Sequence, residues 1–93
     1  IVEKMCHNPA KVFKIRNRGF IKEGYFADLT IVDTHAPWNV NKDNILYKCG
    51  WSPFEGTNFK SRIMHTLVNG KIVYSNGKVA KGTHGQRLLF DRK

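Results

Sequence analysis

Alternating apolar and polar residues are clearest in residues 24–33. From Ala27 to Ile31 every second side chain is apolar, which is the period of a β-strand. Gly24 opens this run and Asp33 closes it. The pattern therefore predicts a single strand that the chain enters from a tight turn.

Two later apolar runs predict a hairpin. Residues 63–69 and 71–75 are rich in residues that favour strands, and Asn69-Gly70 lies between them. This dipeptide is a strong hairpin signal, because a type I′ turn requires positive φ at both of its central positions. Asn76-Gly77 repeats the signal before residues 78–80, so a further strand is expected there.

The N-terminal residues have the spacing of helices instead. Residues 1–7 place apolar side chains at positions i, i+3 and i+4, which form one face of a helix. Asn8-Pro9 predicts a break and a new start, because Asn is a good N-cap and Pro is favoured at the first helical position. A second short helix is expected at residues 10–15.

These elements predict a mainly β fold with short N-terminal helices. Short strands are also expected at residues 20–21 and 38–40. The chain divides into a helical segment (1–18), a β region (19–80) and a basic C-terminal tail (81–93). It begins at Ile1 with neither an initiator Met nor a capping residue, which predicts a cut end inside a longer protein.

Charge adds a second hypothesis. The 93 residues carry 16 Lys and Arg against 7 Asp and Glu, a net charge of +9, and such a balance favours polyanions. The basic residues are spread along the chain and are dense only in residues 11–18, so a solvated basic face is the simpler interpretation. A basic β-domain that binds nucleic acid is the alternative, and binding to single strands that weakens steeply with salt would identify it. Absence of binding at low salt would exclude it.

Residues that could carry chemistry are isolated from one another. Asp28 is a candidate acid or base, but a carboxylate that accepts hydrogen bonds from turn amides is the commoner arrangement. Ser52 has no Gly-x-Ser-x-Gly motif around it, and His65 lies alone on a strand face. Cys6 and Cys49 have neither CxxC nor zinc spacing and are expected to be reduced thiols. The histidines show no metal-binding pattern: His7, His35, His65, His84. We therefore predict no catalytic, cofactor-binding or metal-binding residue in this chain.

No apolar run approaches about 18 residues, so no membrane span is predicted.

Several blocks of the sequence together resemble one family. They are NPAK at 8–11, GFIKEGYFADL at 19–29, SPFEG at 52–56, VNGKIVY at 68–74 and GQRLLF at 85–90. The first two resemble a passage near the C-terminus of cyclic amidohydrolases. The SPFEG block is similar to a loop of dihydroorotases and of their allantoinase and hydantoinase relatives, and the last block resembles the end of certain bacterial dihydroorotases. The sequence thus resembles the C-terminal portion of a dihydroorotase.

This resemblance implies a zinc-dependent parent enzyme of pyrimidine biosynthesis in the cytoplasm. Such a parent has a (β/α)₈ barrel and a small β-sandwich, and it would bind two zinc ions through barrel residues that precede the matched passage. The chain itself would be a non-catalytic part that binds no metal and braces the barrel. Its partner would be the remainder of the parent chain, and exposed apolar faces, including Met5, Trp51 and Phe54, would favour self-association. A parent that acts on allantoin or a hydantoin is the alternative within the family.

Overall fold

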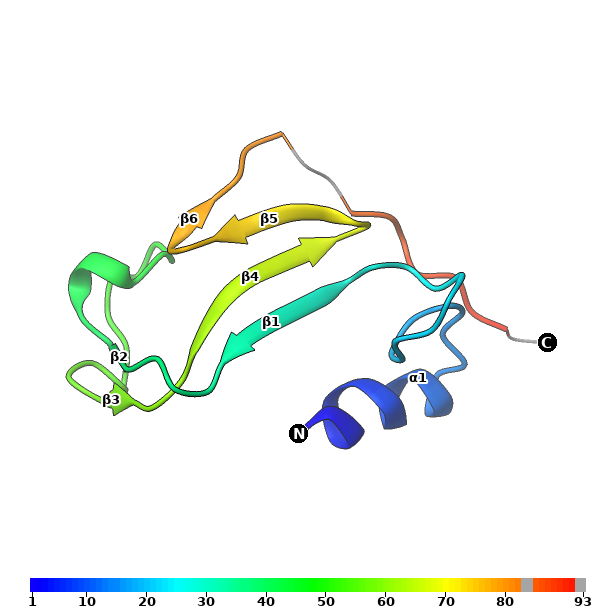
Figure 1. Cartoon of the computed structure of the whole chain (residues 1–93), viewed down its shortest axis with the longest axis horizontal. Coiled ribbons are helices and arrows are strands. Elements are labelled where there is room, and N and C mark those ends of the chain that lie inside the picture. Colours follow the sequence, from blue (N-terminus) through cyan, green and yellow to red (C-terminus); the bar gives the residue numbers. More distant parts are fainter. Residues whose placement is uncertain (83–84, 92–93) are drawn as a thin grey trace.

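The regular structure of the chain is mostly antiparallel β-sheet (Figure 1). The computed structural model describes residues 1–82 and 85–91. A four-stranded sheet has the order β1-β4-β5-β6, and β2 pairs with β3 in a separate two-stranded sheet. The strands are β1 (Leu29–Asp33), β2 (Trp38–Asn39), β3 (Asn58–Phe59), β4 (Arg62–Val68), β5 (Lys71–Ser75) and β6 (Lys78–Val79). A short 3₁₀ helix, η2 (Lys42–Asn44), follows β2 and has a capping box formed by Asn41.

Both predicted hairpin turns are confirmed. In the turn between β4 and β5, φ is 52° at Asn69 and 75° at Gly70. In the turn between β5 and β6, φ is 49° at Asn76 and 85° at Gly77. Positive φ at both central positions is the type I′ geometry that the two Asn-Gly dipeptides predict.

The strand predicted for residues 24–33 is shorter than its pattern. It begins at Leu29, which pairs with Leu67 on β4. Because β4 ends at Val68, the residues before Leu29 lie opposite the β4–β5 turn and have no strand to pair with. Instead, the Gly70 amide donates a hydrogen bond to the Ala27 carbonyl at 3.0 Å. An alternating pattern extends beyond its strand here because the partner strand ends first.

The predicted break at Asn8-Pro9 is wrong. A π-helical turn, η1 (Glu3–His7), continues directly into α1 (Asn8–Val12). Asn8 has helical φ and ψ of −65° and −45°, and its amide donates to the Glu3 carbonyl five residues back. Proline removes one helical amide but is tolerated in a first turn, and the widened turn before Pro9 keeps the chain coiled.

The second helix also ends earlier than predicted. Lys14 has a φ of 55°, in the left-handed region, and this ends the helical path before Ile15. Ile15 instead forms an isolated antiparallel bridge with Phe90. The predicted strand at residues 20–21 is wrong as well, because neither residue 20 nor residue 21 joins a sheet. Phe20 instead stacks on His7, with the ring centroids 4.2 Å apart.

Much apolar surface is left uncovered. Among the described residues, Ala10 is the one buried hydrophobic residue, at 6% exposure. The accessible surface is 7903 Å², whereas a compact protein of this mass exposes about 5,500 Å². The radius of gyration is 15.6 Å, compared with about 12 Å for a compact domain of this length. The chain is therefore an open layer of secondary structure with a thin core.

Candidate functional site

An apolar groove lies beside the four-stranded sheet. Its volume is about 620 Å³. It is lined by side chains of the four-stranded sheet, of β2 and β3, and of residue 61: Val32, Trp38, Phe59, Ser61, Arg62, Ile63, Thr66, Val73, Tyr74 and Val79. None of these is a carboxylate, thiol or imidazole, and Tyr74 and Arg62 are the titratable side chains, so this lining is suited to bind apolar groups and offers no carboxylate or imidazole base and no thiol nucleophile.

Arg62 is the charged residue of the groove, and its guanidinium is engaged mainly by contacts within the chain. Its Nη2 donates a hydrogen bond to the Pro37 carbonyl at 2.7 Å, and its guanidinium lies 5.0 Å from the centroid of the Trp38 ring. Its Nε is buried without a hydrogen-bond partner. Arg62 therefore ties the loop before β2 to β4, and it holds the indole against the end of that strand.

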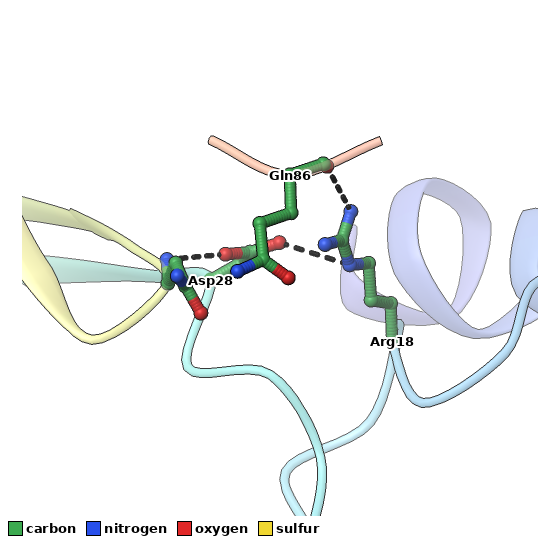
Figure 2. A network of polar contacts seen from close by, with 4 residues as sticks. Arg18, Asp28 and Gln86 are labelled. Carbon is green, nitrogen blue, oxygen red and sulfur yellow. Dashed lines mark hydrogen bonds and ion pairs between the residues drawn. The ribbon is translucent and has the colours of Figure 1, made fainter. Parts of the chain in front are cut away.

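A second cluster surrounds Asp28 (Figure 2). Asp28 Oδ1 accepts a hydrogen bond from the Asn69 amide at 2.7 Å, and Oδ2 lies 3.2 Å from Arg18 Nε. The interpretation of Asp28 as an acceptor for a turn amide is thus confirmed. The contact between Oδ2 and Nε is an ion pair without hydrogen-bond geometry. Arg18 Nη1 donates to the Gln86 carbonyl at 3.2 Å, and the guanidinium lies 4.3 Å from the Phe26 ring centroid.

The place of Arg18 in this cluster was not predicted from the sequence. The dense basic residues 11–18 indicated a solvated face, whereas the Arg18 side chain is only 12% exposed. Ten residues separate Arg18 from Asp28 and 68 separate it from Gln86, so no local spacing rule connects them. Asp28 within an apolar strand pattern was the available signal, because an inward carboxylate needs a partner.

The SPFEG loop is organised by turns. Ser52 Oγ accepts a hydrogen bond from the Phe54 amide at 3.1 Å, and the Gly56 amide donates to the Val40 carbonyl at 2.6 Å. Trp51 and Phe54 are 61% and 57% exposed. Their predicted packing against another domain stays a prediction, and the Ser52 hydroxyl serves the local turn.

The histidines lie in three different environments. His7 stacks on Phe20, His35 Nδ1 lies 3.2 Å from Thr34 Oγ1, and His65 is half-buried on β4. His84 falls outside the described residues. Within 1–82 and 85–91, no three His, Cys, Asp or Glu residues come close enough to hold a metal ion. The residues present here do not fit the two-zinc centre that the resemblance implies for the parent, so no step of its reaction is assigned to them.

Several cations of the chain lie over its own aromatic rings. Lys11 and Lys22 lie within 6 Å of the Phe20 centroid, in addition to the Arg18 and Arg62 contacts described above. These rings and cations stabilise one another within the fold. The hypothesis of nucleic-acid binding is not tested by these contacts and stays a prediction.

In the part of the chain that the structure describes, no helix has the length and apolarity to cross a bilayer.

Comparison with known proteins decides the family. The family model described as "Amidohydrolase family" matches residues 1–73. The chain belongs to the amidohydrolase family. The match extends from the N-terminal helix through β4 and into β5, and so includes Arg18, Asp28 and Asn69.

Individual relatives agree with this assignment. The chain is 40% identical over 89 residues to a dihydroorotase of Pyrococcus furiosus, a match that covers 96% of this chain and 21% of that protein. It is 44% identical over 73 residues to a dihydroorotase of Endomicrobium trichonymphae, covering 78% of this chain and 17% of that protein. The chain thus spans about a fifth of the length of these curated relatives.

A solved structure has a similar fold over most of this chain. An L-hydantoinase (dihydropyrimidinase) from Arthrobacter aurescens matches with a TM-score of 0.73 and 33% sequence identity. The match covers 85% of this chain and 18% of the hydantoinase. The open layer described above is therefore similar to one part of a much larger enzyme.

Proposed function

We propose that this chain is the C-terminal, non-catalytic portion of a dihydroorotase. The parent would hydrolyse the cyclic amide of dihydroorotate and, in reverse, close carbamoyl aspartate into the ring during pyrimidine biosynthesis. The observation that carries the proposal is the similarity to a dihydroorotase over 96% of the chain at 40% identity. The four-fifths of that relative without a counterpart here is long enough to contain a separate catalytic domain.

The chain would contribute structure rather than chemistry. The two zinc ions, with the residues that bind them, would belong to the remaining part of the parent. In this proposal residues 1–18 lie on the side of the (β/α)₈ barrel, residues 19–80 form strands of the small β-sandwich together with the SPFEG loop, and residues 81–93 form the tail. The mainly β architecture and the N-terminal helix support this division.

The partner of the chain would be the rest of its parent. The accessible surface exceeds that of a compact protein by about 2,400 Å². Permanent interfaces bury about 1,000–2,500 Å² on each side, so the excess has the size of one such interface. The groove and the exposed side chains around it would form part of this contact, because they are apolar and uncovered.

The isolated chain should self-associate through the same surface. We expect Val79→Lys to weaken this association at least about tenfold, because burying an aliphatic side chain contributes about 1.5–3 kcal/mol and a charge opposes it. Val79 lines the groove and is 61% exposed, so the lysine can be accommodated in the monomer. Sedimentation over a range of concentrations measures the effect.

A matched control for Val79 is Ile21→Lys. Ile21 is 88% exposed and does not line the groove, so this variant should associate like the natural chain. Monomeric behaviour of the natural chain at all concentrations, or an equal effect of both lysines, would contradict a role for the groove.

Activity tests the parent assignment directly. The complete gene product is expected to hydrolyse dihydroorotate, and the 93-residue chain is expected to produce no hydrolysis above background. Loss of absorbance of the substrate, followed for both proteins in parallel, gives the answer. Turnover by the isolated chain would contradict the non-catalytic role, and an inactive complete protein that is correctly folded would contradict the parent assignment.

A hydantoinase parent is the second candidate. It is supported by the similarity to the L-hydantoinase structure at 33% identity. The same assay with a 5-substituted hydantoin distinguishes the two, because a dihydroorotase should prefer dihydroorotate. Turnover of the hydantoin alone would support this second candidate.

A further inference from the structure

Residues 85–91 return to the end of the N-terminal helix and lie beside residues 14–16 (Figure 1). The Arg16 amide donates to the Leu89 carbonyl at 2.8 Å, and the Asp91 amide donates to the Lys14 carbonyl at 2.8 Å. These two bonds flank the antiparallel bridge between Ile15 and Phe90. The C-terminal segment thus covers the main-chain edge of residues 14–16.

The contacts that Arg16 and Arg18 make with this segment differ in burial. Arg16 Nε lies 3.2 Å from Asp91 Oδ1, but these side chains are 51% and 73% exposed, so solvent screens the pair. Arg18, only 12% exposed, donates from Nη1 to the Gln86 carbonyl at 3.2 Å (Figure 2). A hydrogen bond from a charged donor that is withdrawn from solvent contributes more than an exposed pair. Arg18 is therefore the main side-chain anchor.

The same guanidinium connects the segment to the sheet. Asp28 pairs with Arg18 through one carboxylate oxygen and accepts the Asn69 amide through the other. Gly85 passes close to the end of β4, since a Cβ placed there would lie 3.1 Å from Val68 Cγ1. The C-terminal segment and the β4–β5 turn thus share one polar network.

We propose that residues 85–91 form a strap that opens and closes as a unit, with Arg18 as its latch. Opening exposes the Arg16 amide and the Lys14 carbonyl, the two main-chain groups that the closed strap pairs. Closing it also stabilises the β4–β5 turn, because the bond to Gln86 orients the guanidinium that holds Asp28. The proposal is independent of the reaction of the parent enzyme.

Hydrogen exchange of single amides in the intact chain tests the strap. The Arg16 and Asp91 amides should be protected, and to the same extent, because one opening event exposes both. In Arg18→Ala their protection should fall about 10–150-fold, the effect of one hydrogen bond to a charged group. The Ala80 amide, which donates to the Val73 carbonyl on β5, should change less than about twofold.

Two further chains complete the experiment. Gln86→Ala keeps the main-chain carbonyl that accepts from Arg18, so it should exchange like the natural chain. A chain that ends at Gly82 lacks the strap, and its Asn69 amide should lose protection about 2–5-fold if the network is coupled. This truncated chain remains informative even if Arg18→Ala does not fold.

Three results would overturn the strap. The first is an intact chain with unprotected or unequally protected Arg16 and Asp91 amides. The second is an Arg18→Ala chain with unchanged protection there, or with an equal loss at Ala80, which would make Arg18 a general stabiliser. The third is a truncated chain whose Asn69 amide exchanges as before, which would remove the coupling to the β4–β5 turn.

Discussion

Gly19→Ala should destabilise the chain by about 3 kcal/mol, because two unfavourable effects act at one residue. Gly19 has a φ of 86°, a conformation that costs an L-residue about 1–2 kcal/mol. A Cβ built there would lie 2.5 Å from the Ala10 Cβ and 2.7 Å from the Cys6 carbonyl oxygen. Both contacts are too short to persist, and the helix backbone must move away. Because Ala10 is the one buried hydrophobic residue of the described chain, this movement exposes the centre of its thin core.

Gly24→Ala separates the two effects. Gly24 has a similar φ of 81°, but a Cβ there would meet nothing within 4 Å. This variant should lose only the backbone contribution, about 1–2 kcal/mol. Urea unfolding followed by circular dichroism compares the two at low protein concentration. Equal losses in both variants would show that the contact between Gly19 and the helix contributes nothing.

Asp28→Ala should destabilise the chain by about 2–3 kcal/mol. The substitution leaves the Asn69 amide without its acceptor and Arg18 without its counter-ion. Because the Asp28 side chain is 32% exposed and the Arg18 side chain 12% exposed, water replaces these contacts only in part. Asp28→Asn keeps an oxygen for the amide but loses the charge, so its loss should be about half as large. The free energy of unfolding in urea measures both variants.

Asp33→Ala is the matched control for Asp28. Asp33 Oδ1 also accepts a main-chain amide, from His35 at 2.9 Å, but this bond is local and exposed. Its removal should cost no more than about 0.5 kcal/mol. If Asp28→Ala destabilised the chain no more than Asp33→Ala, the network around Arg18 would have no special role in stability.

The family and the hairpins could be predicted because their signals are local. Asn69-Gly70 and Asn76-Gly77 determine their turns through the φ angles that Asn and Gly tolerate, and no distant contact is required. The sequence blocks that indicate a cyclic amidohydrolase are likewise runs of adjacent residues, and the family match over residues 1–73 agrees with them.

Other elements depended on partners that local patterns do not specify. The strand predicted from Gly24 begins at Leu29 because β4 ends at Val68. The helix continues through Asn8 because the π-helical turn before Pro9 preserves the helical path, whereas capping rules consider only the residue types. The strand expected at residues 20–21 is absent because Phe20 stacks on His7 instead of joining a sheet.

The sequence by itself determined the family, the turns, the mainly β class and the interpretation of Asp28 as an acceptor for a turn amide. Only the tertiary structure identified Asn69 as the residue that supplies this amide, Arg18 as the cation beside Asp28, and the C-terminal segment as the neighbour of residues 14–16. The physical reason is the distance along the chain over which each interaction acts. Backbone preferences act over two to four residues, whereas a half-buried carboxylate is satisfied by whichever donors the fold brings within about 3 Å.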